Sequence, residues 1–138
     1  MDEDYKNLDI YKYFKESKLH SSKANTYFNI YNELFHKYRN KKITFVEIGV
    51  KWGGSLLMWK KFFGNDARII GIDLYPDTKK LEKYGFEIFI GDQSSDIFWK
   101  NFFLEVGKID ILLDDGGHTS ENQILTLNNV INNVNDDG

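Results

Sequence analysis

The sequence predicts an α/β fold in which helices cover a parallel sheet. Four short apolar segments, rich in β-branched residues, alternate along the chain with longer segments of helical character. Strands that alternate with helices in this way form parallel sheets with right-handed crossovers. At 138 residues, 41% of them hydrophobic and one of them proline, the chain is also large and apolar enough for one domain with its own core.

The first predicted helix covers Ala24–Tyr38. Its apolar side chains recur at helical spacing, which predicts one buried face. That face consists of Tyr27, Ile30, Tyr31, Leu34, Phe35 and Tyr38. The polar and basic stretch "HKYRNKK" closes this helix and separates it from the first strand.

The first predicted strand, Ile43–Ile48, lies in the apolar stretch "ITFVEIGV", between a basic turn and several glycines. The other three predicted strands are Arg68–Asp73, Phe86–Ile90 and Ile109–Asp114. The connection between the second and third strands, "LYPDTKKLEKYG", is short, so we expect only one or two helical turns there.

Capping residues set the limits of the remaining predicted helices. For the two helices in the middle of the chain they are, in order, Gly53, Gly54, Gly64, Ser94 or Ser95, and Gly107. The last helix begins near Thr119, where the pair Ser120 and Gln123 has the spacing of a capping box.

Composition excludes several classes of protein. The net charge of −3 and the pI of about 5.6 give no general attraction for nucleic acid or for anionic membranes. The absence of cysteine removes disulfides, thiolate nucleophiles and cysteine zinc sites. The acidic start "MDEDYKNLDI" is no signal peptide, and no apolar run approaches the ~20 residues of a spanning helix. We therefore expect a soluble, cytoplasmic protein.

Carboxylates mark the end of every predicted strand. They are Glu47, Asp73, Asp92, Asp114 and Asp115. Each one alone is explained as a turn or cap residue, and the glycines beside them as tight turns. Together they meet at the carboxyl edge of one parallel sheet, where ligands bind in open α/β folds. The sequence therefore predicts a ligand site at this edge.

An adenosine cofactor without a pyrophosphate suits this site best. A carboxylate that ends the second strand, here Asp73, can accept hydrogen bonds from both ribose hydroxyls. The dinucleotide pattern G-x-G-x-x-G is not met, because Lys51 stands where the second glycine belongs. An acidic pocket attracts a cation and repels a pyrophosphate. These features favour S-adenosylmethionine over NAD, and an NAD-type dehydrogenase remains a weaker alternative.

The ordered motifs "VEIGVKWGGSLLMWKKFF", "IIGIDLYP", "FIGDQSS" and "IDILLDDGGHTSENQ" resemble class I S-adenosylmethionine-dependent methyltransferases. They are most similar to the branch of macrocin and mycinamicin sugar O-methyltransferases and proteins labelled cephalosporin hydroxylase. The lead-in "SSKANTYFNIYNELFHKYR" resembles the same branch, so the resemblance covers Ser22 to Val134. It implies a Rossmann-like sheet of strand order 3-2-1-4 and transfer of a methyl group to a sugar or other small-molecule hydroxyl.

The resemblance also implies roles for individual residues. The cofactor-binding set would be Glu47, Gly49, Gly53, Asp73, Asp92, Gln93 and Asp114. Within it, Glu47 and Gly49 would line the methionine part, and Asp73 would hold the ribose. Asp92 and Gln93 would lie near the adenine, and Asp114 would lie under the sulfonium end.

The same resemblance implies that Asp115 binds Mg²⁺ and that His118 is the general base. A divalent ion lowers the pKa of a chelated sugar hydroxyl, and a neutral imidazole then takes its proton. Hard oxygen ligands fit Mg²⁺ rather than zinc. The simpler alternative is that Asp115 caps the helix starting near Thr119, and that His118 merely starts that helix.

One departure from the family pattern concerns the closing "NDDG", which resembles the turn before the family's fifth strand. We therefore expect a sheet truncated before that strand, with a helical segment over residues 1–40 and a partial cofactor-binding domain over residues 41–138. An unpaired sheet edge favours association, so a homo-oligomer through that edge is expected. The alternative to an active enzyme is a fragment or module that binds cofactor without catalysis.

Overall fold

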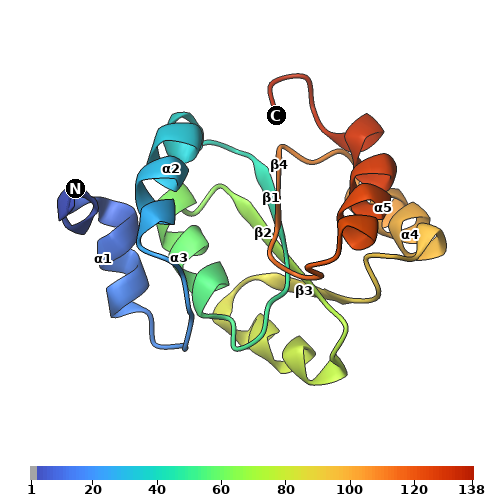
Figure 1. The fold of residues 1–138 in the computed structure, drawn as a ribbon, viewed down its shortest axis with the longest axis horizontal. Coiled ribbons are helices and arrows are strands. Elements are labelled where there is room, and N and C mark those ends of the chain that lie inside the picture. The colour runs from blue at the N-terminus through green and yellow to red at the C-terminus, as the bar shows by residue number, and fades with distance from the viewer. Residues whose placement is uncertain (1–2) are drawn as a thin grey trace.

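The computed structural model describes residues 3–138, and its centre is a parallel sheet (Figure 1). In the described chain the sheet has four strands, ordered β3-β2-β1-β4. Their bounds are β1 Thr44–Ile48, β2 Arg68–Asp73, β3 Glu87–Ile90 and β4 Ile111–Asp114. Strand β1 pairs in parallel with both β2 and β4, and β2 pairs in parallel with β3. The predicted fold class and strand order are confirmed.

Helices lie on both faces of the sheet (Figure 1). The first face carries α1 Asp9–Glu16, α2 Thr26–Phe35 and α3 Gly54–Phe63, and the second carries α4 Asp96–Val106 and α5 Ser120–Val130. Four short 3₁₀ segments complete the described chain: η1 Glu3–Asn7, η2 His36–Tyr38, η3 Pro76–Tyr84 and η4 Ile131–Asn133. Among residues 3–138, no helix is both long and apolar enough to cross a membrane.

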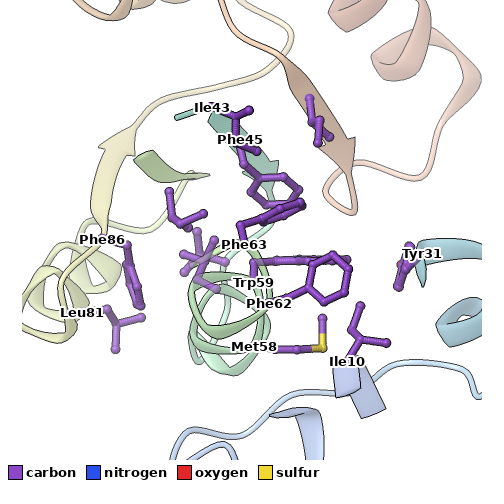
Figure 2. Packing of buried hydrophobic residues seen from close by; sticks show 14 of the residues in the cluster. Ile10, Tyr31, Ile43, Phe45, Met58, Trp59, Phe62, Phe63, Leu81 and Phe86 are labelled. Carbon is purple, nitrogen blue, oxygen red and sulfur yellow. The ribbon is translucent and has the colours of Figure 1, made fainter. Parts of the chain in front are cut away.

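An aromatic core fills the space between β1 and the helices of the first face (Figure 2). Trp59 of α3 is fully buried at its centre. The Trp59 ring centroid lies 5.0 Å from those of Tyr31 and Phe45 and 5.6 Å from that of Phe63. Because these rings come from α2, β1 and α3, the aromatic contacts fix the helical lead-in against the sheet.

A smaller core lies on the second face of the sheet. Val46, Ile70 and Ile72 point from the strands toward Trp99 and Phe102 of α4, and all of these side chains are buried. Alternate residues of β1 therefore serve opposite cores, as the two-residue repeat of a strand covered on both faces requires.

The predicted buried face of the first helix is wrong in part. Tyr27, Ile30 and Leu34 are 48%, 47% and 55% exposed, whereas Phe28, which lies outside that face, is fully buried. Phe28 packs against aromatic rings of η1 and α1, including Tyr11 with ring centroids 5.2 Å apart. The helix is thus rotated toward partners that the periodicity of α2 alone cannot reveal.

The predicted start of the last helix near Thr119 is confirmed, but its predicted capping box is wrong. The Thr119 hydroxyl accepts a hydrogen bond from the backbone N–H of Asn122 at 3.2 Å, so Thr119 is the N-cap in place of a Ser120–Gln123 box. Asp115 is not the cap either, which removes the simpler explanation of that residue. The predicted cap Ser95 is confirmed, since its hydroxyl accepts from the backbone N–H of Phe98.

Candidate active site

A cleft of about 260 Å³ opens at the carboxyl ends of the strands. Its walls come from the loops that follow all four strands and from the first turn of α5. Of the residues predicted for the ligand site, those that line it are Gly49, Asp73, Asp92, Gln93 and Asp115. The parallel sheet therefore brings together residues that are up to 66 positions apart in the sequence, as expected for this edge.

Gly49 sets the closest approach in this cleft. Its backbone has a φ of 91°, in the left-handed region that favours glycine. A Cβ atom there would lie 2.3 Å from the carbonyl oxygen of Asp115. Glycine is therefore required for the turn after β1 to pack against the turn after β4.

Glu47 is a buried carboxylate in which one oxygen accepts hydrogen bonds and the other has no hydrogen-bond partner within residues 3–138. Its Oε2 accepts hydrogen bonds from Ser55 Oγ at 2.8 Å, Trp59 Nε1 at 3.2 Å and Lys23 Nζ at 3.3 Å. Its Oε1 has no partner within residues 3–138. Burial raises the pKa of Glu47, and the Lys23 ammonium opposes this rise. A buried acceptor without a donor is costly, so this atom is suited to a donor from a ligand.

Lys23 is the residue of the site that the residue-by-residue prediction missed. Its ammonium also lies 2.8 Å from Asp115 Oδ2, and its side chain is only 4% exposed. Burial acts to lower the pKa of Lys23, but the Glu47 and Asp115 carboxylates outweigh it, and the pKa lies above its ordinary value. The signal was present in the lead-in "SSKANTYF", which the family resemblance included without a role for the lysine.

Asp73 shapes the loops on either side of the cleft. Its Oδ2 accepts from the backbone N–H groups of Val50 at 2.9 Å and Lys51 at 3.1 Å, and its Oδ1 accepts from that of Tyr75 at 2.9 Å. These bonds use three of the roughly four lone-pair sites of the carboxylate, so Oδ1 keeps acceptor capacity toward a ligand. Asp92 is exposed at the rim, where its Oδ1 accepts from the backbone N–H of Ser94.

Gln93 and Asp114 tie the loops after β3 and β4 together. Gln93 Nε2 donates to Asp114 Oδ2 at 3.0 Å and to Thr126 Oγ1 at 2.9 Å, and its Oε1 accepts from the backbone N–H of Gly117 at 2.6 Å. Both amide hydrogens of Gln93 are therefore used within the protein. Asp114 lines a separate cavity of about 330 Å³ beside α2 rather than the main cleft.

Four predicted site residues do not line the cleft: Glu47, Gly53, Asp114 and His118. Gly53 forms the turn before α3 with a φ of 85°, and a Cβ there would lie 2.9 Å from the side chain of Leu81. His118 is exposed, and the described residues that line the cleft do not include it. The side chain of Asp115 is 42% exposed and carries the Lys23 ion pair. Within residues 3–138, no three Asp, Glu, His or Cys side chains are grouped so that they could hold a metal ion.

Comparison with models of protein families finds none that matches this chain. Among known proteins, the 8-demethyl-8-alpha-L-rhamnosyl tetracenomycin-C 2'-O-methyltransferase of Streptomyces olivaceus is 30% identical over 120 residues, which is 82% of this chain and 31% of that protein. The demethylmacrocin O-methyltransferase of Streptomyces fradiae is 35% identical over 66% of this chain and 24% of its own length. The mycinamicin VI 2''-O-methyltransferase of Micromonospora griseorubida is 36% identical over 64% and 23%. The chain thus spans less than a third of the length of these relatives.

Solved structures show the same relationship. The MycE methyltransferase from the mycinamycin biosynthetic pathway, in complex with Mg, SAH and mycinamycin VI, matches with a TM-score of 0.77 and 28% identity. The match covers 93% of this chain and 35% of that one. A Thermoplasma acidophilum protein with a TM-score of 0.59 and 16% identity shares the fold alone.

Proposed function

The chain is a homologue of the sugar O-methyltransferases and has the class I S-adenosylmethionine-dependent methyltransferase fold, and from this we propose that it is the cofactor-binding part of such an enzyme. The reaction would transfer a methyl group to a hydroxyl of a sugar or other small molecule. The observation that carries this proposal is the buried Oε1 of Glu47, which has no partner within residues 3–138 and belongs to a residue two positions before Gly49 of the cleft.

The charges around Glu47 suit the amino-acid end of S-adenosylmethionine. Glu47 and Asp115 bring two negative charges, and Lys23 brings one positive charge. One negative charge therefore remains, and an α-ammonium group would both neutralise it and donate to Oε1. Gly49 would let this end of the cofactor approach the backbone.

The remaining proposed contacts follow the length of the cleft. Asp73 would accept from the ribose hydroxyls, and Asp92 and Gln93 would flank the adenine. Gly53 and Asp114 would act from the margin, by shaping the turn before α3 and by holding the loop after β4. When bound, the cofactor supplies a methyl group already activated on its sulfonium. These residues then contribute mainly positioning.

Calorimetry tests the cofactor directly. We expect S-adenosylmethionine and its product S-adenosylhomocysteine (SAH) to bind, and Glu47→Gln to bind SAH roughly tenfold more weakly because a charge-assisted hydrogen bond is lost. Tighter binding of NAD than of SAH would contradict the proposal and favour a dehydrogenase.

The pH dependence of this binding follows from Glu47. Its pKa is raised by burial, so it takes up a proton on acidification before an exposed glutamate does. The stability that Glu47 contributes is full below its unfolded pKa and is lost as the pH rises through its folded pKa. SAH affinity changes in the opposite sense: on acidification below neutral pH it should fall in the wild type as Glu47 takes up its proton, and fall less in Glu47→Gln.

Asp115 and His118 are proposed for the acceptor side. Asp115 would offer one oxygen ligand to Mg²⁺, although the described residues do not by themselves complete a magnesium site. Mg²⁺ would supply charge stabilisation to an acceptor hydroxyl. The neutral imidazole of His118 would accept the proton of that hydroxyl, and its exposed position leaves it free to meet an acceptor.

His118→Ala separates catalysis from cofactor binding. We expect the variant to bind SAH within about twofold of the wild type, since an exposed side chain outside the cleft is removed. In the complete enzyme, methyl transfer to a glycosylated acceptor should be lost, as followed by SAH production. Unchanged transfer, or transfer insensitive to a chelator, would contradict the roles of His118 and Asp115.

A cofactor-binding module without catalysis is the second candidate, and the absence of a three-ligand metal group within residues 3–138 favours it. Binding of SAH without transfer to any acceptor would distinguish it.

We also propose that residues 1–40 act as a helical cover for the cofactor-binding domain of residues 41–138. Association through the outer edge of β4 is a further proposal, which sedimentation would test.

A further inference from the structure

We propose that Lys23 is a positioning residue, which fixes Glu47 for the cofactor's amino-acid end by bridging it to Asp115. The inference rests on the proposed function, because it concerns the same cofactor. It adds a residue from the N-terminal lead-in, outside the strand tips, to the binding machinery.

The geometry places Lys23 between two elements of the sheet. Its ammonium lies 3.3 Å from Glu47 Oε2 at the end of β1 and 2.8 Å from Asp115 Oδ2 after β4. The side chain of Glu47 is fully buried and that of Lys23 is 4% exposed, so water screens their attraction little. One cation therefore sets the positions of two carboxylates, one in β1 and one directly after the neighbouring strand β4.

The contact of Lys23 with Glu47 also helps to determine which oxygen of Glu47 remains available to a ligand. Ser55, Trp59 and Lys23 all donate to Oε2, which leaves Oε1 bare. Without Lys23, Glu47 would face Asp115 with no cation between them, and burial would favour its neutral form. A neutral, reoriented carboxyl would attract an α-ammonium group much less.

Lys23 is not needed to hold its own segment in place. The backbone N–H of Gly54 donates to the carbonyl of His20 at 3.1 Å, and Ser17 Oγ donates to the carbonyl of Gly54 at 3.3 Å. The His20 ring also packs against the Trp52 ring with centroids 4.7 Å apart. Substitution of Lys23 should therefore change the charge at Glu47 while the segment stays on α3.

The experiment compares two ligands that differ in the amino-acid end. SAH carries it, and 5′-methylthioadenosine lacks it but keeps the adenosine. In calorimetry, Lys23→Met should bind SAH roughly tenfold more weakly and 5′-methylthioadenosine as the wild type does. Lys23→Arg keeps the bridging cation and should recover most of the SAH affinity. Lys61→Met, which removes an exposed lysine paired with Glu16 at 3.8 Å, is the control and should change neither affinity.

Each outcome separates this inference from the proposed function. Equal weakening of both ligands in Lys23→Met would show a general structural role, and unchanged SAH affinity would show no role; either result overturns the inference. If Lys23→Met does not fold, Lys23→Gln, which keeps a polar side chain without the positive charge, is compared in the same way and should show the same selective loss. Failure of the wild type to bind SAH would instead overturn the proposed function.

Discussion

Replacement of Trp59 by alanine is expected to lower the free energy of unfolding by about 3–5 kcal/mol. The side chain is fully buried and lies among rings from three elements, so its removal leaves a cavity that the surrounding helices cannot fill. It also removes the indole N–H that donates to Glu47 at 3.2 Å. Urea unfolding followed by circular dichroism measures the change.

Two further variants separate packing from hydrogen bonding at this position. Trp59→Phe keeps most of the ring volume and loses the N–H, so it should cost about 1–3 kcal/mol. Trp52→Ala removes a tryptophan that is 58% exposed and loses its contact with the His20 ring, so it should cost no more than about 1.5 kcal/mol. Equal stability of Trp59→Ala and Trp52→Ala would contradict the central place of Trp59 in the core.

Asp73→Ala is expected to weaken SAH binding by roughly 1.5–3 kcal/mol, since the charge-assisted hydrogen bond from the ribose to the remaining acceptor site on Oδ1 is at stake. The loss should be as large for 5′-methylthioadenosine, because both ligands share the ribose. Lys23 and Glu47 variants should affect SAH alone, so calorimetry with the two ligands distinguishes the two ends of the cleft.

The matched control is Asp77→Ala, which removes an exposed aspartate four positions further along the chain. It should leave both affinities unchanged. Asp73→Ala also leaves the backbone N–H of Val50 without its hydrogen-bond acceptor. A thermal melt must therefore accompany the titration, to show that the variant is folded. Undiminished ribose binding in a folded Asp73→Ala protein would remove Asp73 from the proposed contacts.

The sheet and most helix limits could be predicted because they depend on local patterns. The β-branched run Arg68–Asp73 needs two covered faces, and Ser95 and Gly107 cap α4 through bonds to nearby residues. Positions that depend on distant partners were predicted less well. Phe28 is buried by rings of α1 and η1, which the spacing within α2 does not encode.

In the candidate site, too, the features that depend on the order of elements could be predicted, and those that depend on distant partners could not. Parallel strands must bring their carboxyl ends together, so the cleft beside Gly49, Asp73 and Asp115 followed from the order of elements. The lysine that bridges two of its carboxylates comes from a segment without regular structure, and no periodicity predicts where its side chain reaches. The carboxylates at the strand ends predicted a cation in the pocket, and the ammonium of Lys23 is such a cation within the chain itself.

The Lys23–Asp115 ion pair joins residues 92 positions apart. Contacts of such separation form late in folding, because the chain between them must first be ordered. At roughly 5–20 residues per second, a ribosome needs several seconds to pass from one residue to the other. A nascent chain therefore has no complete pocket until β4 has joined the sheet. The cofactor can therefore stabilise the complete pocket only after β4 is in place.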